Sequence, residues 1–318
     1  MQRFQLGREL VLAILLIVVL VVFSLLSSSF LSVENFFNVG RLSVETGLIA
    51  LGMTGVILTG GIDLSVGSLL SLVAVVVGFS YQDGLALGLA ILLGLAVGLA
   101  GGLFNALFVT RLGLHPLVVT LGTLSLYSGI ALVLSGGSGV SSFPHWFVYL
   151  GQWYLGPVPV QLIFFAVVAA LTWIVLARTP FGRYLYAIGD NVEAARFSGV
   201  PVRRVLIALY TAVGLLVAIA AIIYTSRVSS ARADAGFGLE LDVIAAVVLG
   251  GASIYGGVGS IPGTLLGVFF IAFVGNGLLL AGVESTWRQF VIGLILIVAV
   301  FVNEFFRAGA SPTAATPA

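Results

Sequence analysis

Apolar blocks of about 20 residues recur along almost the whole chain, and they constrain its fold more than any other feature. The hydrocarbon core of a bilayer is about 30 Å thick, and a helix of about 20 apolar residues crosses it. Of the 318 residues, 60% are hydrophobic and 8% are charged, whereas soluble domains have about 25% charged residues. The sequence therefore excludes an ordinary soluble enzyme and predicts helices that face lipid.

We identify ten candidate spans, which predict an all-α, polytopic bundle of transmembrane helices. They are residues 9–26, 43–60, 63–80, 85–109, 115–134, 160–177, 203–225, 241–256, 262–281 and 287–305. The longest connections are residues 27–42, 135–159, 178–202 and 226–240, too short for a soluble domain. Residues 1–307 are therefore predicted to form a single transmembrane domain, and the small, proline-containing tail 308–318 is predicted to be disordered.

The placement of arginine predicts the orientation, because cytoplasmic loops of membrane proteins carry an excess of basic residues. Ten spans put both termini on one side of the membrane. That side holds nine of the thirteen basic residues, namely Arg3, Arg8, Arg111, Arg178, Arg183, Arg196, Arg203, Arg204 and Arg307. The other side holds Arg41, Arg227, Arg232 and Arg288. Both termini are therefore predicted to be cytoplasmic.

The residue inventory excludes several kinds of chemistry. The chain has no cysteine and no lysine, so it lacks thiolate metal sites and the lysine that a P-loop places on nucleotide phosphates. His115 and His145 have no second histidine nearby, and the spans hold no cluster of acids and bases. We therefore expect no metal, no cofactor and no catalytic residue. The net charge of +1 gives no reason to expect a nucleic-acid partner.

A first glycine pair, Gly60 and Gly61, interrupts an apolar region within residues 59–68 (TGGIDLSVGS). Asp63 and Ser65 follow where a new helix would begin, and both are suited to cap it. A carboxylate costs about 2.5–3.5 kcal/mol at the centre of a bilayer, so Asp63 is expected at the interface or in a helix break buried by protein. We predict a discontinuous helix that lines a pathway through the bundle or braces its cytoplasmic gate; a plain capped hairpin is the alternative.

A second glycine pair, Gly250 and Gly251, lies in residues 249–260, and Val-Gly-Ser recurs at 66–68 and 258–260. Gly-interrupted segments in the two halves of a membrane protein indicate a substrate pathway. Polar residues inside apolar spans are further candidates, because each must find a hydrogen-bond partner in lipid. They are Asn105, Thr120, Thr123, Ser125, Tyr127 and Asn276. The alternative role for each is a hydrogen bond that joins two helices.

Residues 178–202 contain complete signals for a short helix outside the lipid. Asp190 or Asn191 is suited to the N-cap and Glu193 to the first turn, whereas Gly199 and Pro201 end the helix. A two-turn helix is marginal by itself in water, so the segment must dock. It docks either on its own bundle or on a cytoplasmic partner, and its small apolar face would consist of Ala194, Ala195 and Phe197.

Three stretches, taken together and in order, resemble the permease subunits of bacterial ATP-binding-cassette (ABC) importers for monosaccharides. They are residues 55–68 (GVILTGGIDLSVGS), 182–200 (GRYLYAIGDNVEAARFSGV) and 238–263 (GLELDVIAAVVLGGASIYGGVGSIPG). The similarity extends over residues 10–305 and is greatest to the group that carries ribose, xylose, rhamnose and autoinducer-2.

The resemblance implies a permease subunit of the bacterial inner membrane that has no enzymatic activity of its own. Two permease chains, identical or different, would pair with two ABC ATPase subunits, and a periplasmic or lipoprotein sugar-binding protein would deliver the monosaccharide. By position, the short helix is similar to the segment that couples to the ATPase, which implicates Asp190, Asn191, Glu193, Ala194, Ala195, Arg196 and Gly199. For the translocation pathway we expect Gly60, Gly61, Asp63, Ser65, Asn105, Thr120, Thr123, Gly250, Gly251 and Asn276.

Other functions stay open on the sequence alone. An ABC permease for branched-chain amino acids has a similar pattern. A secondary transporter coupled to protons or sodium would need ionisable groups in the membrane, and only Asp63 and Glu45 come close. A membrane-embedded enzyme would need a cluster of acids, bases or metal ligands within the spans.

Overall fold

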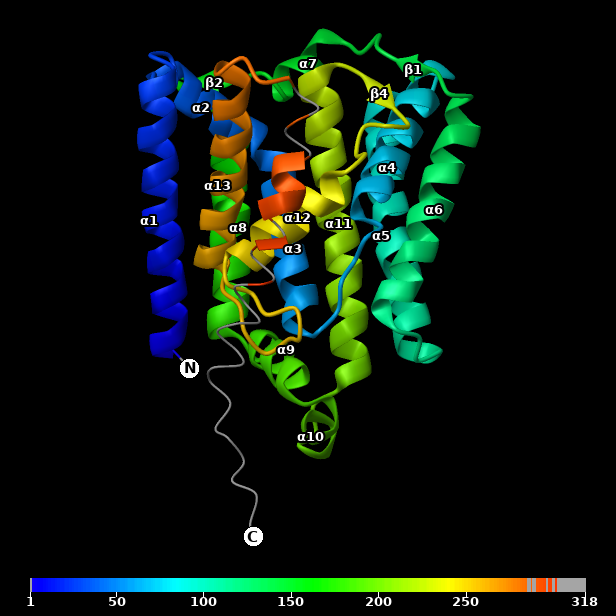
Figure 1. The fold of residues 1–318 in the computed structure, drawn as a ribbon. Helices are drawn as coiled ribbons and strands as arrows, with labels where there is room; N and C mark the ends of the chain where they lie inside the picture. The colour runs from blue at the N-terminus through cyan, green and yellow to red at the C-terminus, as the bar shows by residue number, and fades with distance from the viewer. Residues whose placement is uncertain (1, 285–286, 288–289, 296, 299–300, 302–318) are drawn as a thin grey trace.

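The computed structural model describes residues 2–284, 287, 290–295, 297–298 and 301. Long helices run between two ends of the molecule (Figure 1). One end carries α7 (His145–Leu150) and the short strands, and the other carries α9 (Pro180–Asp190) and α10 (Val192–Phe197). We call these the α7 end and the α10 end. The N-terminus lies at the α10 end.

Six of the described helices are long and apolar enough to cross a membrane. They are α1 (Gln2–Leu26, apolar from Glu9), α5 (Leu87–Arg111), α6 (Pro116–Ser135), α8 (Val160–Arg178), α11 (Val202–Val228) and α13 (Ile261–Leu280). A pair of helices, α2 (Val33–Leu42) and α3 (Val44–Leu58), is bent by 48° and adds a seventh when it counts as one span. The polytopic, all-α fold is thus confirmed.

The predictions of ten spans and of discontinuous helices at the two glycine pairs are not confirmed. The apolar blocks 43–60, 63–80 and 241–256 largely coincide with α3, α4 (Val66–Gln82) and α12 (Leu239–Leu249), which have 15, 17 and 11 residues. Helices α3 and α12 end just before a glycine pair, and α4 begins five residues after Gly61. In the block 287–305, the described residues 287, 290–295, 297–298 and 301 are helical, whereas the tail 308–318 lies wholly outside the described residues.

Three of the connections contain helices that the sequence did not reveal. Residues 27–42 contain α2, residues 135–159 contain α7, and residues 178–202 contain α9 as well as the expected α10. Four two-residue strands lie near the α7 end: β1 (Gly139–Val140) pairs with β4 (Ala231–Arg232), and β2 (Tyr154–Leu155) pairs with β3 (Val158–Pro159), both antiparallel.

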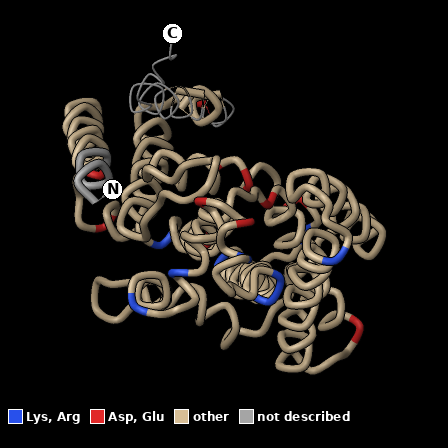
Figure 2. The backbone as a smooth tube through the Cα atoms, turned by 90° about the horizontal axis from the view of Figure 1, so that it is seen from below, with Lys and Arg blue, Asp and Glu red and all other residues tan. Residues whose placement is uncertain are grey.

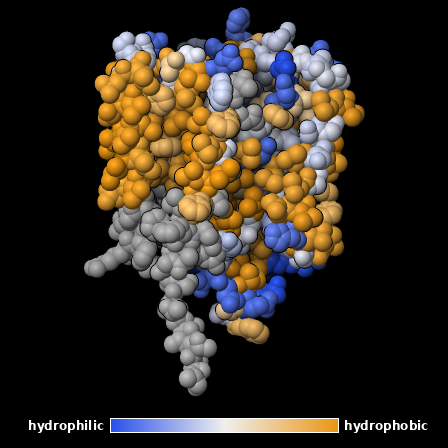
Figure 3. All heavy atoms as spheres, viewed as in Figure 1, coloured by the Kyte–Doolittle hydropathy of each residue, from blue (hydrophilic) through white to orange (hydrophobic). Residues whose placement is uncertain are grey.

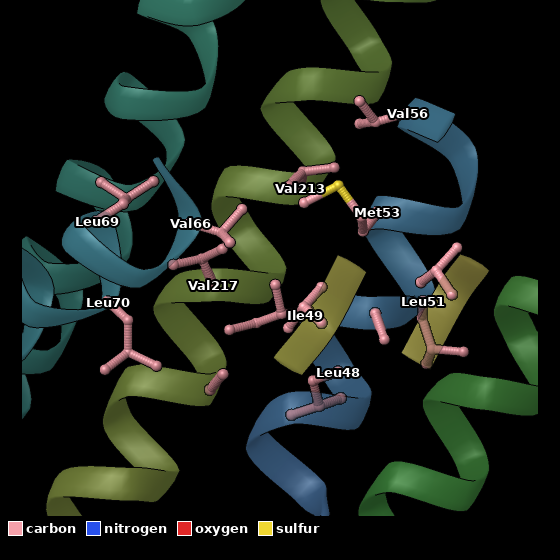
Figure 4. Close-up of a cluster of buried hydrophobic side chains, with 14 of the residues drawn as sticks. Leu48, Ile49, Leu51, Met53, Val56, Val66, Leu69, Leu70, Val213 and Val217 are labelled. Carbon is pink, nitrogen blue, oxygen red and sulfur yellow. The ribbon is translucent and has the colours of Figure 1, made fainter. Parts of the chain in front are cut away.

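Helix α3 lies in the centre and is buried on nearly all sides. A helix that is apolar all round belongs in the interior of a large bundle, and α3 packs against α11, α12, α13 and α8. Side chains from three helices meet in this core (Figure 4): Leu48, Ile49 and Met53 of α3, Val66, Leu69 and Leu70 of α4, and Val213 and Val217 of α11.

The outer helices expose apolar surface. Only 6% of the apolar part of α1 is buried, and 22% and 28% of α8 and α6. The visible face of the molecule has a broad hydrophobic region between more hydrophilic ends (Figure 3). A soluble protein rarely leaves so large an apolar surface uncovered, whereas lipid covers it in a membrane. The chain is a multi-pass membrane protein.

Helices α5 and α11 approach each other closely through small residues. Gly98 and Gly102 of α5 lie against Gly214 and Ala218 of α11. A Cβ atom added at Gly102 would overlap the carbonyl oxygen of Tyr210, and one added at Gly214 would overlap that of Gly98. Small residues permit this approach, because transmembrane helices associate mainly by packing of their backbones and side chains.

Gly102→Ala is therefore expected to destabilise the protein by about 1–3 kcal/mol, as overpacked cores do. Gly88→Ala on the same helix is the matched control, since its Cβ would meet nothing within 4 Å. Thermal unfolding of the detergent-purified variants measures the difference. Equal melting temperatures for the two variants would show that the α5–α11 contact is looser than described.

Candidate functional site

The first glycine pair ends α3. Gly60 has a φ of +77°, a left-handed conformation that glycine adopts without the strain of a Cβ atom. The N–H of Gly61 donates to the carbonyl of Val56 over 3.0 Å, which closes the last turn of the helix. The chain then runs from the lower end of α3 back toward the middle of the bundle, where α4 begins (Figure 1).

Asp63 organises the start of α4. Its Oδ1 accepts hydrogen bonds from the backbone N–H of Ser65 over 2.9 Å and from the Ser65 hydroxyl over 2.6 Å. The Asn105 amide of α5 donates to the Ser65 Oγ over 2.8 Å. All three side chains are buried. A buried carboxylate at a helix N-terminus is stabilised by these donors and by the helix dipole.

Two residues of α6 extend this cluster. The Tyr127 hydroxyl donates to the carbonyl of Gly101 over 2.9 Å and lies 3.4 Å from the Asn105 Oδ1. The Thr120 hydroxyl donates to the carbonyl of Ile62 over 3.0 Å, so α6 holds the segment between α3 and α4 directly. We call Asp63, Ser65, Asn105, Thr120 and Tyr127 the Asp63 cluster.

The other expected residues of α6 contribute less. The Thr123 hydroxyl is buried but bonds within its own helix, to the carbonyl of Val119 over 3.2 Å. Ser125 is exposed on the outer surface of the helix. Tyr210 of α11 was not predicted from the sequence; its buried hydroxyl faces Gly61 and has no hydrogen-bond partner in the described residues. A tyrosine inside an apolar span was a usable signal, since its hydroxyl needs a partner.

The second glycine pair follows the end of α12 at Leu249. Gly250 packs against the backbone of Gly263, so neither position has room for a side chain. Helix α13 begins after Ser260, whose Oγ accepts from the N–H of Gly263 over 3.0 Å. The same hydroxyl donates to the carboxylate of Glu9 on α1. This hydrogen bond connects α1 to the second break.

The two breaks meet each other beside α9. The N–H of Gly257, in the second break, donates to the carbonyl of Leu58 at the end of α3 over 2.9 Å. The Tyr186 hydroxyl of α9 donates to the carbonyl of Gly259 over 2.8 Å. Gly189 of α9 lies against the same Leu58 carbonyl, where a Cβ atom would overlap it. We call Leu58, Gly189 and Gly257 the break junction.

Helix α10 follows α9 directly and forms nearly as the sequence indicates. Asn191 is its N-cap, with Oδ1 accepting from the N–H of Ala194 over 2.9 Å, whereas Asp190 is the last residue of α9. Gly199 has a φ of +81°, and the next N–H, of Val200, returns to the carbonyl of Ala195 over 3.0 Å. The helix ends at Phe197, one residue earlier than expected.

The faces of α10 are divided between the bundle and the surface. Ala195 is buried against its own chain, whereas Ala194 is exposed and Phe197 is 91% exposed. Glu193 and Arg196 form an exposed ion pair of 2.9 Å, which adds little stability. Ala195 therefore anchors the helix, and Phe197 is exposed at the α10 end.

Charge is sparse throughout the described chain, as the view from the α10 end shows (Figure 2). Within that part of the chain, no three His, Asp or Glu residues gather as a metal site would require.

Glu45, one of two ionisable groups considered for ion coupling, lies at the α7 end and forms an ion pair of 2.7 Å with Arg227. Close by, hydrogen bonds from Arg232 lower the pKa of Asp234 below its usual value.

Asn276 does not join the Asp63 cluster. It lies near the α7 end of α13 and forms two hydrogen bonds with Asn35 of α2. The structure thus brings together Gly60, Gly61, Asp63, Ser65, Asn105 and Thr120, and places Gly250 and Gly251 in the second break, which contacts the first.

Comparisons with known proteins identify the family of the chain. The family model described as "Branched-chain amino acid transport system / permease component" matches residues 35–300. The chain is 43% identical over 302 residues to the ribose import permease protein RbsC of Bacillus subtilis (strain 168), which covers 94% of this chain and 92% of that protein. No solved structure matches the chain.

Two further relatives are similar over comparable lengths. The ribose import permease protein RbsC of Haemophilus influenzae is 37% identical over 95% of this chain and 96% of its own length. The autoinducer 2 import system permease protein LsrD of Photorhabdus luminescens is 39% identical, over 94% of this chain and 91% of that protein. The resemblance found in the sequence is confirmed.

Proposed function

Because the chain belongs to the family of branched-chain amino acid transport system permease components, we propose that it is the membrane subunit of an ATP-driven importer for a monosaccharide. The observation that carries this proposal is the similarity to two ribose import permeases over more than nine-tenths of the chain. The same similarity favours a sugar over a branched-chain amino acid, although the family description names the latter.

The residues of the Asp63 cluster and the breaks suit a neutral substrate. Hydroxyl and amide groups predominate there, and Asp63 is engaged by Ser65. The chain has no lysine, so a P-loop ATPase must be supplied by separate subunits. We infer two ABC ATPase subunits, a second permease chain that is identical or related, and an external sugar-binding protein as partners.

The described helices support a topology in which the α10 end faces the cytoplasm. In chain order they run between the two ends alternately, with α3, α4 and α12 as the interrupted members (Figure 1). Segments at the α10 end carry Arg111, Arg178, Arg183, Arg196, Arg203 and Arg204, and those at the α7 end carry Arg41, Arg227 and Arg232. Basic residues are enriched on the cytoplasmic side of membrane proteins, so we infer ten passages with cytoplasmic termini.

Coupling proceeds through α10 in this proposal. Its exposed Phe197 and Ala194 enter a groove of the ATPase, and its anchored Ala195 passes motion to α9. Helix α9 contacts both breaks through Gly189 and Tyr186. ATP drives transport only when the ATPase binds it more tightly in one of the two orientations of the permease. Closure of the ATPase pair then shifts the bundle between outward and inward access.

Phe197→Ser is expected to reduce co-purification of the ATPase subunit by roughly tenfold or more, because a buried aromatic at an interface carries a large share of the binding energy. Trp146→Ser on α7, at the opposite end, is the matched control, since Trp146 is also an exposed aromatic. Both variants are purified with the ATPase subunit from the same membranes. Retention of the ATPase by Phe197→Ser at the level of Trp146→Ser would argue against α10 as the docking element.

A further inference from the structure

A polar groove opens at the α7 end beside α2. It has a volume of about 900 Å³, and its polar lining comes from α2 and the β2–β3 hairpin. The lining includes Glu34, Asn35, Asn38, Arg41 and Tyr154. The Arg41 guanidinium donates to the Asn38 Oδ1 over 3.0 Å and lies 5.8 Å from the centre of the Tyr154 ring. We call this the outer groove.

A second cavity lies deeper, between the bent pair α2–α3 and the helices α12 and α13. It has a volume of about 330 Å³ and is lined mainly by apolar side chains. Five polar residues also line it: Ser43, Thr46, Asp242, Asn276 and Glu284. An apolar cavity with a few polar groups is the usual form of a small-molecule site. We call this the inner cavity.

One pair of amides joins the two spaces. Asn35 lines the outer groove, and Asn276 lines the inner cavity. The Asn35 Nδ2 donates to the Asn276 Oδ1 over 2.8 Å, and the Asn276 Nδ2 donates to the Asn35 Oδ1 over 3.0 Å. The two helices that carry them, α2 and α13, pack against each other. The reciprocal pair therefore stands between the groove and the cavity.

We propose that the Asn35–Asn276 pair is a gate that binds the hydroxyl groups of a neutral polyol on its way from the outer groove to the inner cavity. This inference rests on the proposed function and names a binding position for its substrate. The pair is separate from the Asp63 cluster, which lies nearer the α10 end.

The chemistry of the pair suits this class of ligand. Each side-chain amide offers a donor and an acceptor, and so does each hydroxyl of a polyol. Each of two neighbouring hydroxyls can donate to one amide oxygen and accept from one amide N–H, so the gate opens without leaving the two freed donors and two freed acceptors unpaired. A charged ligand would gain no counter-charge from the pair. The amides therefore favour a neutral, polyhydroxylated molecule over an ion.

The absence of cysteine from the natural chain permits a direct test. Asn276→Cys is placed in the complete importer, reconstituted in proteoliposomes, and treated with a membrane-impermeant methanethiosulfonate reagent from the side of the binding protein. We expect binding protein loaded with D-ribose, together with ATP, to change the rate of modification. Trp146→Cys, outside both spaces, is the control and should react at a constant rate.

A kinetic measurement separates a gate from a purely structural bond between helices. Asn276→Ala is expected to raise the KM for D-ribose uptake about fivefold, the loss of one neutral hydrogen bond, with a smaller effect on kcat. Two results together would overturn the gate. Asn276→Ala would have a lower melting temperature but an unchanged KM, and the modification rate of Asn276→Cys would be the same with and without ribose. If the wild-type importer takes up no ribose at all, the proposed function fails instead, so the two failures are distinct.

Discussion

Asp63→Ala is expected to lower ATP-driven sugar uptake roughly tenfold or more, while the chain still inserts in the membrane. The variant removes the acceptor of two short hydrogen bonds from Ser65 and leaves that N–H and hydroxyl buried without their partner. Each unpaired buried group costs about 1–3 kcal/mol. The start of α4 and its contact with Asn105 would shift. The first break, which leads into α4, would shift as well.

Two companion variants make this prediction specific. Asp83→Ala removes an exposed carboxylate at the other end of α4 and is expected to leave uptake unchanged. Asp63→Asn keeps an oxygen acceptor without the charge and is expected to retain most of the uptake. Equal uptake by Asp63→Ala and Asp83→Ala would refute the role of the cluster. Complete loss in Asp63→Asn would indicate that the charge itself is needed, as in an ion-coupled transporter.

Gly189→Ala is expected to uncouple the importer, with uptake reduced at least about tenfold and the ATPase subunit still bound. Its Cβ would overlap the Leu58 carbonyl and approach the N–H of Gly257, so α9 would have to move away from both breaks. The docking surface at Phe197 is on α10 and is not altered. Because overlaps with rigid backbone cannot relax by rotation of a side chain, even one methyl group has a large effect.

The measurement compares uptake with ATPase activity stimulated by the loaded binding protein. Gly129→Ala on α6 is the control, because a Cβ there would meet nothing within 4 Å. Uptake by Gly189→Ala at the level of this control would show that motion does not pass through the break junction. Loss of the ATPase subunit from Gly189→Ala would show that α9 holds the docking helix in place rather than relaying its motion.

Local signals in the sequence were sufficient for some parts of this structure. The caps of α10 and the end of α3 follow from Asn191, Gly199 and Gly60, whose roles depend on nearby backbone. The ion-pair partner of Glu45 and the hydrogen-bond partner of Asn276 were not foreseen, because they lie far away in the sequence.

The helices α2 and α9 were missed for a different reason. Both are amphipathic and lie in connections whose polar residues look like loop sequence. Their apolar faces pack on the bundle, as Leu185 and Ile188 of α9 do, and this packing decides their structure more than intrinsic propensity does. The number of spans was also not resolved by hydropathy, because α3, α4 and α12 stop at breaks inside continuous apolar blocks.

We expect this chain to move a monosaccharide at the expense of ATP hydrolysed by another subunit. The direct measurement is uptake of labelled D-ribose into proteoliposomes that contain the chain, its ATPase subunit and the sugar-binding protein, with ATP supplied on the ATPase side. Uptake that requires ATP, the ATPase and the binding protein is the expected result. Uptake by the chain alone, driven by a proton or sodium gradient and unchanged by ATP, would contradict ATP-driven import.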